Sequence, residues 1–501
     1  MSLTRRTTLS LILAAGTAVA ALAAAGPAHA QSRQGNLVLG MVLEPPSLDP
    51  TSAAAAAIGE VVHYNILEGL TKINVDGSVT PLLATGWTTT PDGATYTFAL
   101  RPGVSFSDGK PFDAQAVKFS FERAKAPDSK NKAKRGVFDN ISRITVVDPM
   151  TVILTLDRAD ASLPFRLGEN TAVILHPDTA AQAATAPVGT GPYVLTEWRK
   201  GSAITLTARN DARVKPAIRR VTFRIINDPA AQVAALLAGD IDAMPRFAAF
   251  QSLPQFQGNK RFTVQVGSTA GKGQLTLNNK KKPFDDVRVR RAIAHAIDRK
   301  AFIAGVLEGQ GQPIGSHFAP TDAGYVDLTG VYPYDPEKAK ALLKEAGVAT
   351  PLNVTLTLPP PPYARKGGEV VAAMLAKVGI NAKIENVEWA QWLSGPFKGN
   401  FDMTIINHVE PLDYMQYTNK AYYWGYDSPA FDELAAAHAS TTNAAERLKL
   451  WQQMQRKLAD DAVNAWLFNP AQVAVARRGL QGLWASSPIF ANDIAAVRWG
   501  N

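Results

Sequence analysis

The sequence predicts an α/β protein with more than one domain. Short strands that are apolar or alternate between polar and apolar residues recur along the chain, with amphipathic helices between them. This pattern is typical of α/β folds rather than all-helical or all-β ones. The length of 501 residues exceeds the roughly 250–300 residues at which a single hydrophobic core stops growing. We therefore expect two or three domains.

The first thirty residues predict an export signal. Arg5 and Arg6 precede an apolar run over residues 9–22, and Ala28-His29-Ala30 supplies a small-residue cleavage site before Gln31. Residues 4–9 resemble a twin-arginine signal, although Thr8 stands where that motif favours an aromatic residue. Both the general secretory (Sec) and the twin-arginine (Tat) route stay open, and a retained signal anchor is the alternative to cleavage. Either route predicts a periplasmic protein.

Composition excludes several classes of protein. The chain has no cysteine, so it forms neither a disulfide nor a lipid anchor on a cysteine after the signal. Its net charge of +9 is mild for this length. Two basic clusters, at residues 130–135 and 280–282, lack the interleaved aromatic residues of nucleic-acid sites. We expect them to be solvated surface, and we expect no nucleic-acid partner and a monomer.

Turn sequences and alternating residues predict a β-hairpin and several further strands. Tyr96, Phe98 and Leu100 alternate between two turn sequences, residues 91–93 and 107–109, which predicts a β-hairpin. Helical spacing after Asp113 predicts that a helix follows it. Further strands are expected at residues 37–41, 152–156, 204–206, 221–225, 275–277, 354–356, 401–405 and 473–475.

Helices are predicted where a capping residue and helical spacing coincide. Asp335 and Pro336 provide an N-cap and a first-turn proline, and Gly347 provides the end of that helix. Other helices are expected from Asp286, from Asp298 and over residues 368–379. The prolines at 359–362 are expected to form an extended loop after the strand ending at residue 358. That is the carboxyl end of a strand, where ligands tend to bind in α/β lobes.

Seven segments share their order and spacing with one protein family. The longest runs from Ala84 through Trp87, Asp92-Gly93 and Ser107-Asp108-Gly109 to Ala114. The segments are spread over essentially the whole chain after the signal: residues 44–50, 67–70, 84–114, 188–193, 278–279, 283–292 and 334–343. Together they resemble the peptide- and nickel-class (family 5) solute-binding proteins of ABC importers.

The resemblance implies a two-lobed (type II) periplasmic-binding-protein fold with an additional domain inserted in lobe one. It places the signal at residues 1–30 and the inserted domain at 76–187. Lobe one would comprise residues 31–75, 188–270 and 470–501, and lobe two residues 271–469. The same resemblance implies a solute held between the lobes and membrane permease subunits of an ABC importer as partners.

The sequence contains few features that would indicate an enzyme. The sequence has no Gly-x-Ser-x-Gly or His-Glu-x-x-His motif, and the histidines after the signal are never within four residues of each other. Residues 267–273 resemble a phosphate-binding loop but are one residue short between the glycines and have Gly273 where a hydroxyl is needed. We expect this segment to connect two strands, and we expect no catalytic residue, metal or cofactor.

The strongest candidates for ligand contact follow the strand at 401–405. Peptide-binding relatives carry acidic residues here that meet the ligand's ammonium group, which by resemblance makes Glu410 the first candidate and Asp413 the second. His408 and Asn407 lie in the same segment. A carboxylate in a dry cleft would form a charge-assisted hydrogen bond to an amine. The alternative for both acids is a solvated loop or a helix cap.

Aromatic residues are candidates for the walls of the cleft, with core packing as the alternative for each. The candidate aromatic residues are Trp389, Trp392, Tyr422, Tyr423, Trp424 and, on lobe one, Tyr64.

The chain departs from the dipeptide-binding pattern where those relatives have an arginine that binds the ligand's carboxylate. Leu358 and four prolines stand at that place, and Arg365 is the candidate substitute.

The sequence thus predicts a receptor that closes on a peptide or another amine-bearing solute and delivers it to a permease. Three alternatives stay open: a receptor for an opine-type conjugate or a nickel chelate on the same fold, a chaperone-like holder of unfolded peptides, and a secreted hydrolase that has adopted the fold.

Overall fold

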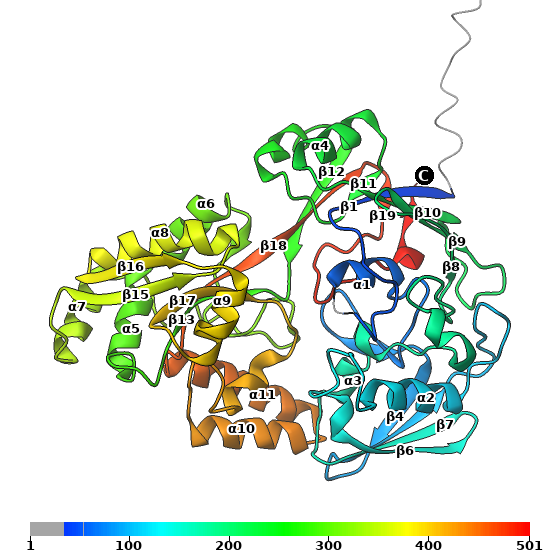
Figure 1. Ribbon diagram of the computed structural model, residues 1–501, viewed down its shortest axis with the longest axis horizontal. Coiled ribbons are helices and arrows are strands. Elements are labelled where there is room, and N and C mark those ends of the chain that lie inside the picture. Colours follow the sequence, from blue (N-terminus) through cyan, green and yellow to red (C-terminus); the bar gives the residue numbers. More distant parts are fainter. Residues whose placement is uncertain (1–34, 54, 501) are drawn as a thin grey trace, which may run out of the picture.

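The structure is a computed structural model that describes residues 35–53 and 55–500 (Figure 1). The predicted signal peptide at residues 1–30 lies outside the described residues. The described part is a mixed α/β protein, which confirms the predicted fold class. Within it, we find no helix with the length and apolar character needed to cross a membrane.

Strands lie along the whole described chain. Those of the first half are β1 (Asn36–Met41), β2 (Thr71–Ile73), β3 (Val79–Pro81), β4 (Ala84–Thr89), β5 (Thr95–Leu100), β6 (Ile141–Asp148), β7 (Thr151–Leu156), β8 (Tyr193–Arg199), β9 (Ala203–Ala208), β10 (Arg220–Ile225) and β11 (Ala243–Met244). Those of the second half are β12 (Phe262–Ser268), β13 (Lys272–Leu277), β14 (Gly311–Gln312), β15 (Leu352–Leu358), β16 (Ile380–Asn386), β17 (Met403–His408), β18 (Ala465–Arg477), β19 (Leu480–Gln481) and β20 (Arg498–Trp499). Each predicted strand overlaps one of these.

Helices alternate with the strands. They are α1 (Ala56–Val62), α2 (Ala114–Lys125), α3 (Leu163–Arg166), α4 (Pro229–Ala238), α5 (Val287–Ala296), α6 (Arg299–Val306), α7 (Pro336–Glu345), α8 (Pro362–Ala376), α9 (Trp389–Ser394), α10 (Pro429–Ser440) and α11 (Ala444–Asp460).

The sheet of lobe one has the order β11-β1-β10-β9-β8. β1 is parallel to both β10 and β11, whereas β10, β9 and β8 pair antiparallel. Leu37, Leu39, Val221 and Phe223 are buried on this sheet against α1. Lobe one therefore has its own core.

The segment predicted as an inserted domain contains a separate antiparallel sheet in the order β4-β5-β7-β6. β4 and β5 form the predicted hairpin, and the turn between them contains Gly93 at a φ of 69°. Asp113 caps α2 because its Oδ1 accepts hydrogen bonds from the backbone of Gln115 and Ala116, at 2.9 and 3.1 Å. A core rich in phenylalanine, including Phe98 and Phe121, lies between this sheet and α2.

Lobe two contains the strands β16-β15-β17-β13-β18 with helices packed against them. The predicted cap of α7 is confirmed, since Asp335 Oδ1 accepts from the backbone of Lys338 at 2.9 Å. The helix predicted at residues 368–379 begins earlier, at Pro362. A proline at the first helical position has the φ of a helix and lacks only an N–H that would have no partner there. The last proline of the run is therefore part of α8 and not of the loop.

Two connections join the lobes into one continuous sheet (Figure 1). The long strand β18 pairs with β13 through its first half and with β12 and β11 through its second. Residues 269–271 connect β12 to β13, as predicted for the segment that resembles a phosphate loop. Asn469 of β18 donates to Thr269 O and Gly271 O, both at 2.7 Å. The two connections are thereby hydrogen-bonded to each other.

Lobe two also contacts the inserted domain. The backbone N–H of Ala161, just before α3, donates to Ala439 O of α10 at 3.1 Å. Ser162 Oγ and the Tyr414 hydroxyl lie 3.4 Å apart. Figure 1 shows α10 against the inserted domain on the side away from β18. The structure is therefore closed around the space between the lobes.

Candidate functional site

A cavity of about 1880 Å³ lies between the lobes. The inserted domain contributes residues from 132 to 171, lobe one contributes residues 246–250 and 487–490, and lobe two contributes residues 408–423 and part of α10. This volume exceeds the ~300–1,000 Å³ typical of sites for small ligands. The cavity therefore has room for a solute larger than a single amino acid.

The lobe-two wall of this cavity is the segment that follows β17. His408 ends β17, residues 409–412 form a short loop, and a 3₁₀ helix begins at Asp413. Leu412 has a φ of 55°, a left-handed conformation that costs energy for a branched side chain and needs support from its surroundings. The support comes from both sides of the loop, where His408 and Asp413 are anchored to the same cluster.

Asp413 is the centre of that cluster. Lys272 Nζ lies 2.7 Å from Asp413 Oδ1, His317 Nε2 lies 3.0 Å from the same oxygen, and His408 Nδ1 lies 3.2 Å from Oδ2. Lys272 and His408 face each other across the antiparallel pair of β13 and β17, which places both side chains on one face of the sheet. Lys272 also donates to Glu410 O at 2.7 Å. A single ammonium group thus holds both Glu410 within the loop and Asp413 just after it.

Electrostatics favour the ionised form of Asp413. Burial would raise the pKa of this carboxyl, but His317 and Lys272 outweigh burial and hold it well below its usual value. Burial lowers the pKa of His317 to about 4, although Asp413 opposes that change. The cluster is therefore charge-balanced by Lys272.

A metal ion is the other partner that such a cluster can take. One ligand atom each from His317, His408 and Asp413 lies within 4.8 Å of the others, and imidazole and carboxylate are ligands of first-row transition metals. Lys272 already occupies Asp413 Oδ1, so a metal would have to displace the ammonium group.

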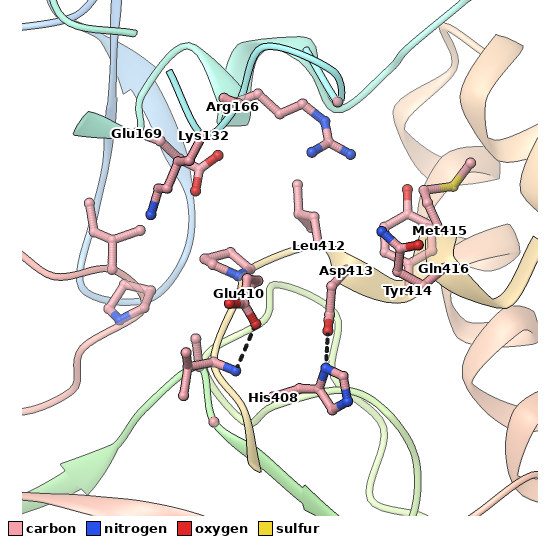
Figure 2. A pocket seen from close by; sticks show the side chains of 18 of the residues that line it. Lys132, Arg166, Glu169, His408, Glu410, Leu412, Asp413, Tyr414, Met415 and Gln416 are labelled. Carbon is pink, nitrogen blue, oxygen red and sulfur yellow. Dashed lines mark hydrogen bonds and ion pairs between the residues drawn. The ribbon is translucent and has the colours of Figure 1, made fainter. Parts of the chain in front are cut away.

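Besides His408 and Asp413, the predicted residues that line the cavity are Glu410, Tyr422 and Tyr423. The Glu410 side chain is exposed, and Figure 2 shows its carboxylate at the cavity wall. Its Oε2 accepts only a weak hydrogen bond, 3.2 Å long, from the Val409 N–H. Among the described residues, no basic group forms an ion pair with it. Glu410 is therefore available to a ligand in a way that Asp413 is not.

Four other predicted residues of lobe two, one asparagine and three tryptophans, lie outside the cavity lining. The Oδ1 of Asn407 is buried near Gly271. Trp424 is fully buried and stacks on Tyr417, with ring centroids 4.3 Å apart. Trp392 is buried and donates to Thr404 Oγ1 at 3.0 Å, whereas the Trp389 side chain is 42% exposed. Core packing accounts for Trp392 and Trp424.

Two more predicted residues also lie outside the lining. Arg365 is on α8, where it pairs with Glu388 at 2.9 Å on the exposed surface. Tyr64 of lobe one is buried and donates to Gly168 O at 3.1 Å. Tyr423, in contrast, lines the cavity, and its hydroxyl lies 2.9 Å from His408 Nε2.

Sequence reasoning missed several residues of this site. Lys272 lies in the segment interpreted only as a strand connection, and His317 is far from the other residues along the chain. Lys132 is exposed, as expected for its basic cluster, but it lines the cavity together with Arg166 and Glu169 of the inserted domain. Lys272 is the first residue of β13, just before the strand predicted at residues 275–277, and no local pattern in the sequence marked it as part of the site.

A histidine next to this wall predicts an acid-dependent loss of stability. His438 of α10 is buried beside Tyr414, and burial, with a contribution from Arg447, lowers its pKa from 6.5 to about 4. Because the unfolded state then binds a proton more readily, the free energy of unfolding should fall as the pH drops from 6.5 towards 4. Replacing His438 by Gln should reduce this fall, measured by urea denaturation at both ends of the range. An unchanged pH dependence would contradict the prediction.

Comparison with known proteins matches this chain to one family. The profile of the bacterial extracellular solute-binding proteins, family 5 Middle, matches residues 78–410. The dipeptide-binding protein of Escherichia coli (strain K12) is 32% identical over 432 residues, which cover 77% of this chain and 79% of that protein. These similar proteins are binding proteins rather than enzymes.

Solved structures show the same two-lobed architecture. The periplasmic binding protein DppA from Helicobacter pylori, in complex with the peptide STSA, has a TM-score of 0.73 at 28% identity and covers 93% of this chain and 98% of its own. The binding protein AgaA from A. tumefaciens R10, in complex with agropinic acid, has a TM-score of 0.75 at 25% identity. This match covers 93% of the present chain and 99% of AgaA. The matched profile, the relatives and the fold together establish that this chain belongs to the family 5 bacterial extracellular solute-binding proteins.

Proposed function

We propose that the protein binds a peptide or peptide-like amine-bearing solute in the cavity between its lobes and delivers it to the permease of an ABC importer. The export signal predicted at residues 1–30 supports a periplasmic location. The observation that carries the ligand assignment is Glu410, an exposed carboxylate on the cavity wall without an ion-pair partner among the described residues. A primary amine would supply the missing charge.

The neighbouring cluster supports the same role for Glu410. Lys272 neutralises Asp413 and also holds the Glu410 backbone, so of the two acids near the end of β17 it is the Glu410 side chain that keeps its negative charge for the solute. Asp413 then acts as an anchor of the loop. Ligand binding drives closure only as far as the solute binds the closed form more tightly than the open one.

A solute of the opine or metal-chelate type is the second candidate. His408, which lines the cavity, and the donor atoms of His317 and Asp413 support a metal-bearing solute. The complex of AgaA with agropinic acid supports an opine-type conjugate, which also carries carboxylates.

Thermal unfolding of the secreted form distinguishes these solutes. A ligand that binds only the native state raises its unfolding temperature by mass action. We expect a rise with short peptides such as trialanine and none with the N-acetylated peptide, which lacks the cationic amine. A rise with opine-type conjugates or with nickel and histidine, and none with peptides, would favour the second candidate.

Replacing Glu410 by Gln tests the amine contact. The variant should bind trialanine more weakly by about 1.5–3 kcal/mol, the usual contribution of a hydrogen bond to a charged group, measured by isothermal titration calorimetry. Glu433→Gln is the matched control, because Glu433 is an exposed glutamate of α10 outside the cavity lining. Equal affinity of the Glu410 variant and the wild type would remove the assignment.

A further inference from the structure

The charges of the cavity walls are distributed unevenly between the domains. The inserted domain contributes four basic side chains and two acidic ones: Lys132, Arg135, Arg158, Arg166, Asp160 and Glu169. Lobe two contributes three acidic side chains, Glu410, Asp413 and Asp432, and one basic side chain, Lys398. Of these acids, Asp413 is paired with Lys272. The cavity is therefore more positive on the inserted-domain side and more negative on the lobe-two side.

Arg166 is the basic residue best placed to meet a solute. It is the last residue of α3, and its Nε lies 3.2 Å from Asp160 Oδ2, which fixes the start of the guanidinium group. Neither terminal nitrogen donates a hydrogen bond to another residue in the described part of the chain. Figure 2 shows these two nitrogens over the cavity, turned towards the loop that contains Leu412. A guanidinium group whose two terminal nitrogens have no partner can donate one hydrogen bond to each oxygen of a carboxylate.

Lys132 adds a second cation on the same wall. Figure 2 shows its ammonium group beside the carboxylate of Glu169, and it forms no hydrogen bond or close ion pair with any residue that the structure describes. Burial raises the pKa of Glu169, and the nearby Glu410 adds to the rise, whereas Arg166 and Lys132 oppose it. Glu169 is thus a weakened counter-charge, and the wall keeps its positive character.

Outside the inserted domain, neither the sequence candidate Arg365 nor the lining arginine Arg246 fills this role. Arg365 is engaged with Glu388 outside the cavity. Arg246 of lobe one lines the cavity, but it already donates to Ser487 Oγ at 3.0 Å and lies 3.5 Å from Glu60. Arg166 keeps its terminal nitrogens for a ligand.

We propose that Arg166, assisted by Lys132, is the anion-binding end of the site, and that the solute carries a carboxylate which these side chains hold from the inserted domain. The solute class is then a zwitterion that spans the cleft, with its carboxylate on the inserted domain and its amine at Glu410. Only the amine end rests on the function proposed above. A ligand held from both sides in this way contributes directly to closure, because each charged group is fully paired only when the domains meet.

The test compares trialanine with trialanine amide, which differ only in the terminal carboxylate. In the wild type, calorimetry should show tighter binding of the free acid. Arg166→Gln should lower the acid-to-amide affinity ratio by about tenfold or more, as expected for loss of a charge-assisted pair. Lys132→Gln should lower it less and in a salt-dependent manner. Arg365→Gln is the matched control and should leave the ratio unchanged.

Two further measurements separate the possible outcomes. Lys132 has no close partner, so Lys132→Gln should fold even if loss of the pair with Asp160 prevents Arg166→Gln from folding. Succinate, which carries carboxylates and no amine, probes the anion end alone. Succinate binding that both variants weaken, without any peptide binding, would support the anion end and remove the peptide proposal. An acid-to-amide ratio of one in the wild type, a ratio unchanged in the variants, or no binding of either probe would overturn the anion end.

Discussion

Replacing Lys272 by Met should destabilise lobe two by about 3–5 kcal/mol, the usual result of removing one partner of a buried ion pair. The Lys272 side chain is 3% exposed, and methionine preserves much of its volume. The variant leaves the Asp413 carboxylate buried beside two imidazoles without its counter-charge. It also removes the hydrogen bond to Glu410 O within the loop. Denaturant unfolding followed by the fluorescence of buried Trp424 and Trp466 would measure the loss.

Two controls separate the buried charge from the lost packing. Lys340→Met removes an exposed partner of Glu337, and such pairs contribute at most about 1 kcal/mol. Combining Lys272→Met with Asp413→Leu removes both charges and should recover part of the stability. If the single Lys272 variant were as stable as the wild type, the ion pair would not support the loop.

Replacing Gly189 by Ala should destabilise the junction between lobe one and the inserted domain by about 3 kcal/mol or more, beyond the ~1–3 kcal/mol of ordinary overpacking. A Cβ at this position would lie 2.0 Å from Ile66 O and 2.8 Å from Leu67 Cδ2. The backbone has no room to move away, because Gly189 O accepts hydrogen bonds from the Ser107 N–H at 2.9 Å and from Arg209. We expect a lower midpoint of thermal unfolding.

Gly305→Ala is the matched control for this substitution. Gly305 lies on α6, and a Cβ there would meet nothing within 4 Å. Alanine is favoured over glycine inside a helix by about 0.5–1 kcal/mol, so this variant should be slightly more stable than the wild type. Equal effects of the two substitutions would show that close approach to Ile66 is unimportant.

Local patterns were sufficient for much of the secondary structure. The hairpin of β4 and β5 and the caps at Asp113, Asp286 and Asp335 depend on neighbouring residues, and the structure has each of them. The start of α8 was placed too late, because a proline run reads as a loop although its last member fits the first turn of a helix. The pairing of β18 with strands of both lobes depends on contacts far apart along the chain, so no local pattern could predict it.

In the site too, local sequence predicted some residues, whereas others depend on contacts between distant segments. Glu410, Asp413 and His408 follow one strand, and the sequence placed them together correctly. The partners of Asp413 come from three separate segments, and only the fold brings Lys272 and His317 to His408. For the aromatic residues, sequence could not distinguish a wall from a core, since Trp424 and Tyr422 are near neighbours and yet only Tyr422 lines the cavity. The gap left by the missing arginine was visible in the sequence, whereas its proposed replacement lies in another domain.

The hydrogen bonds from Asn469 to Thr269 and Gly271 have a consequence for how a solute enters. They hold the two connections between the lobes side by side. Lobe two would therefore rotate about both connections together, as about one hinge, and not about each of them separately. Opening such a hinge widens the far side most. The hydrogen bond between Ala161 and Ala439 would then have to break on opening, and the solute would pass between α10 and the inserted domain.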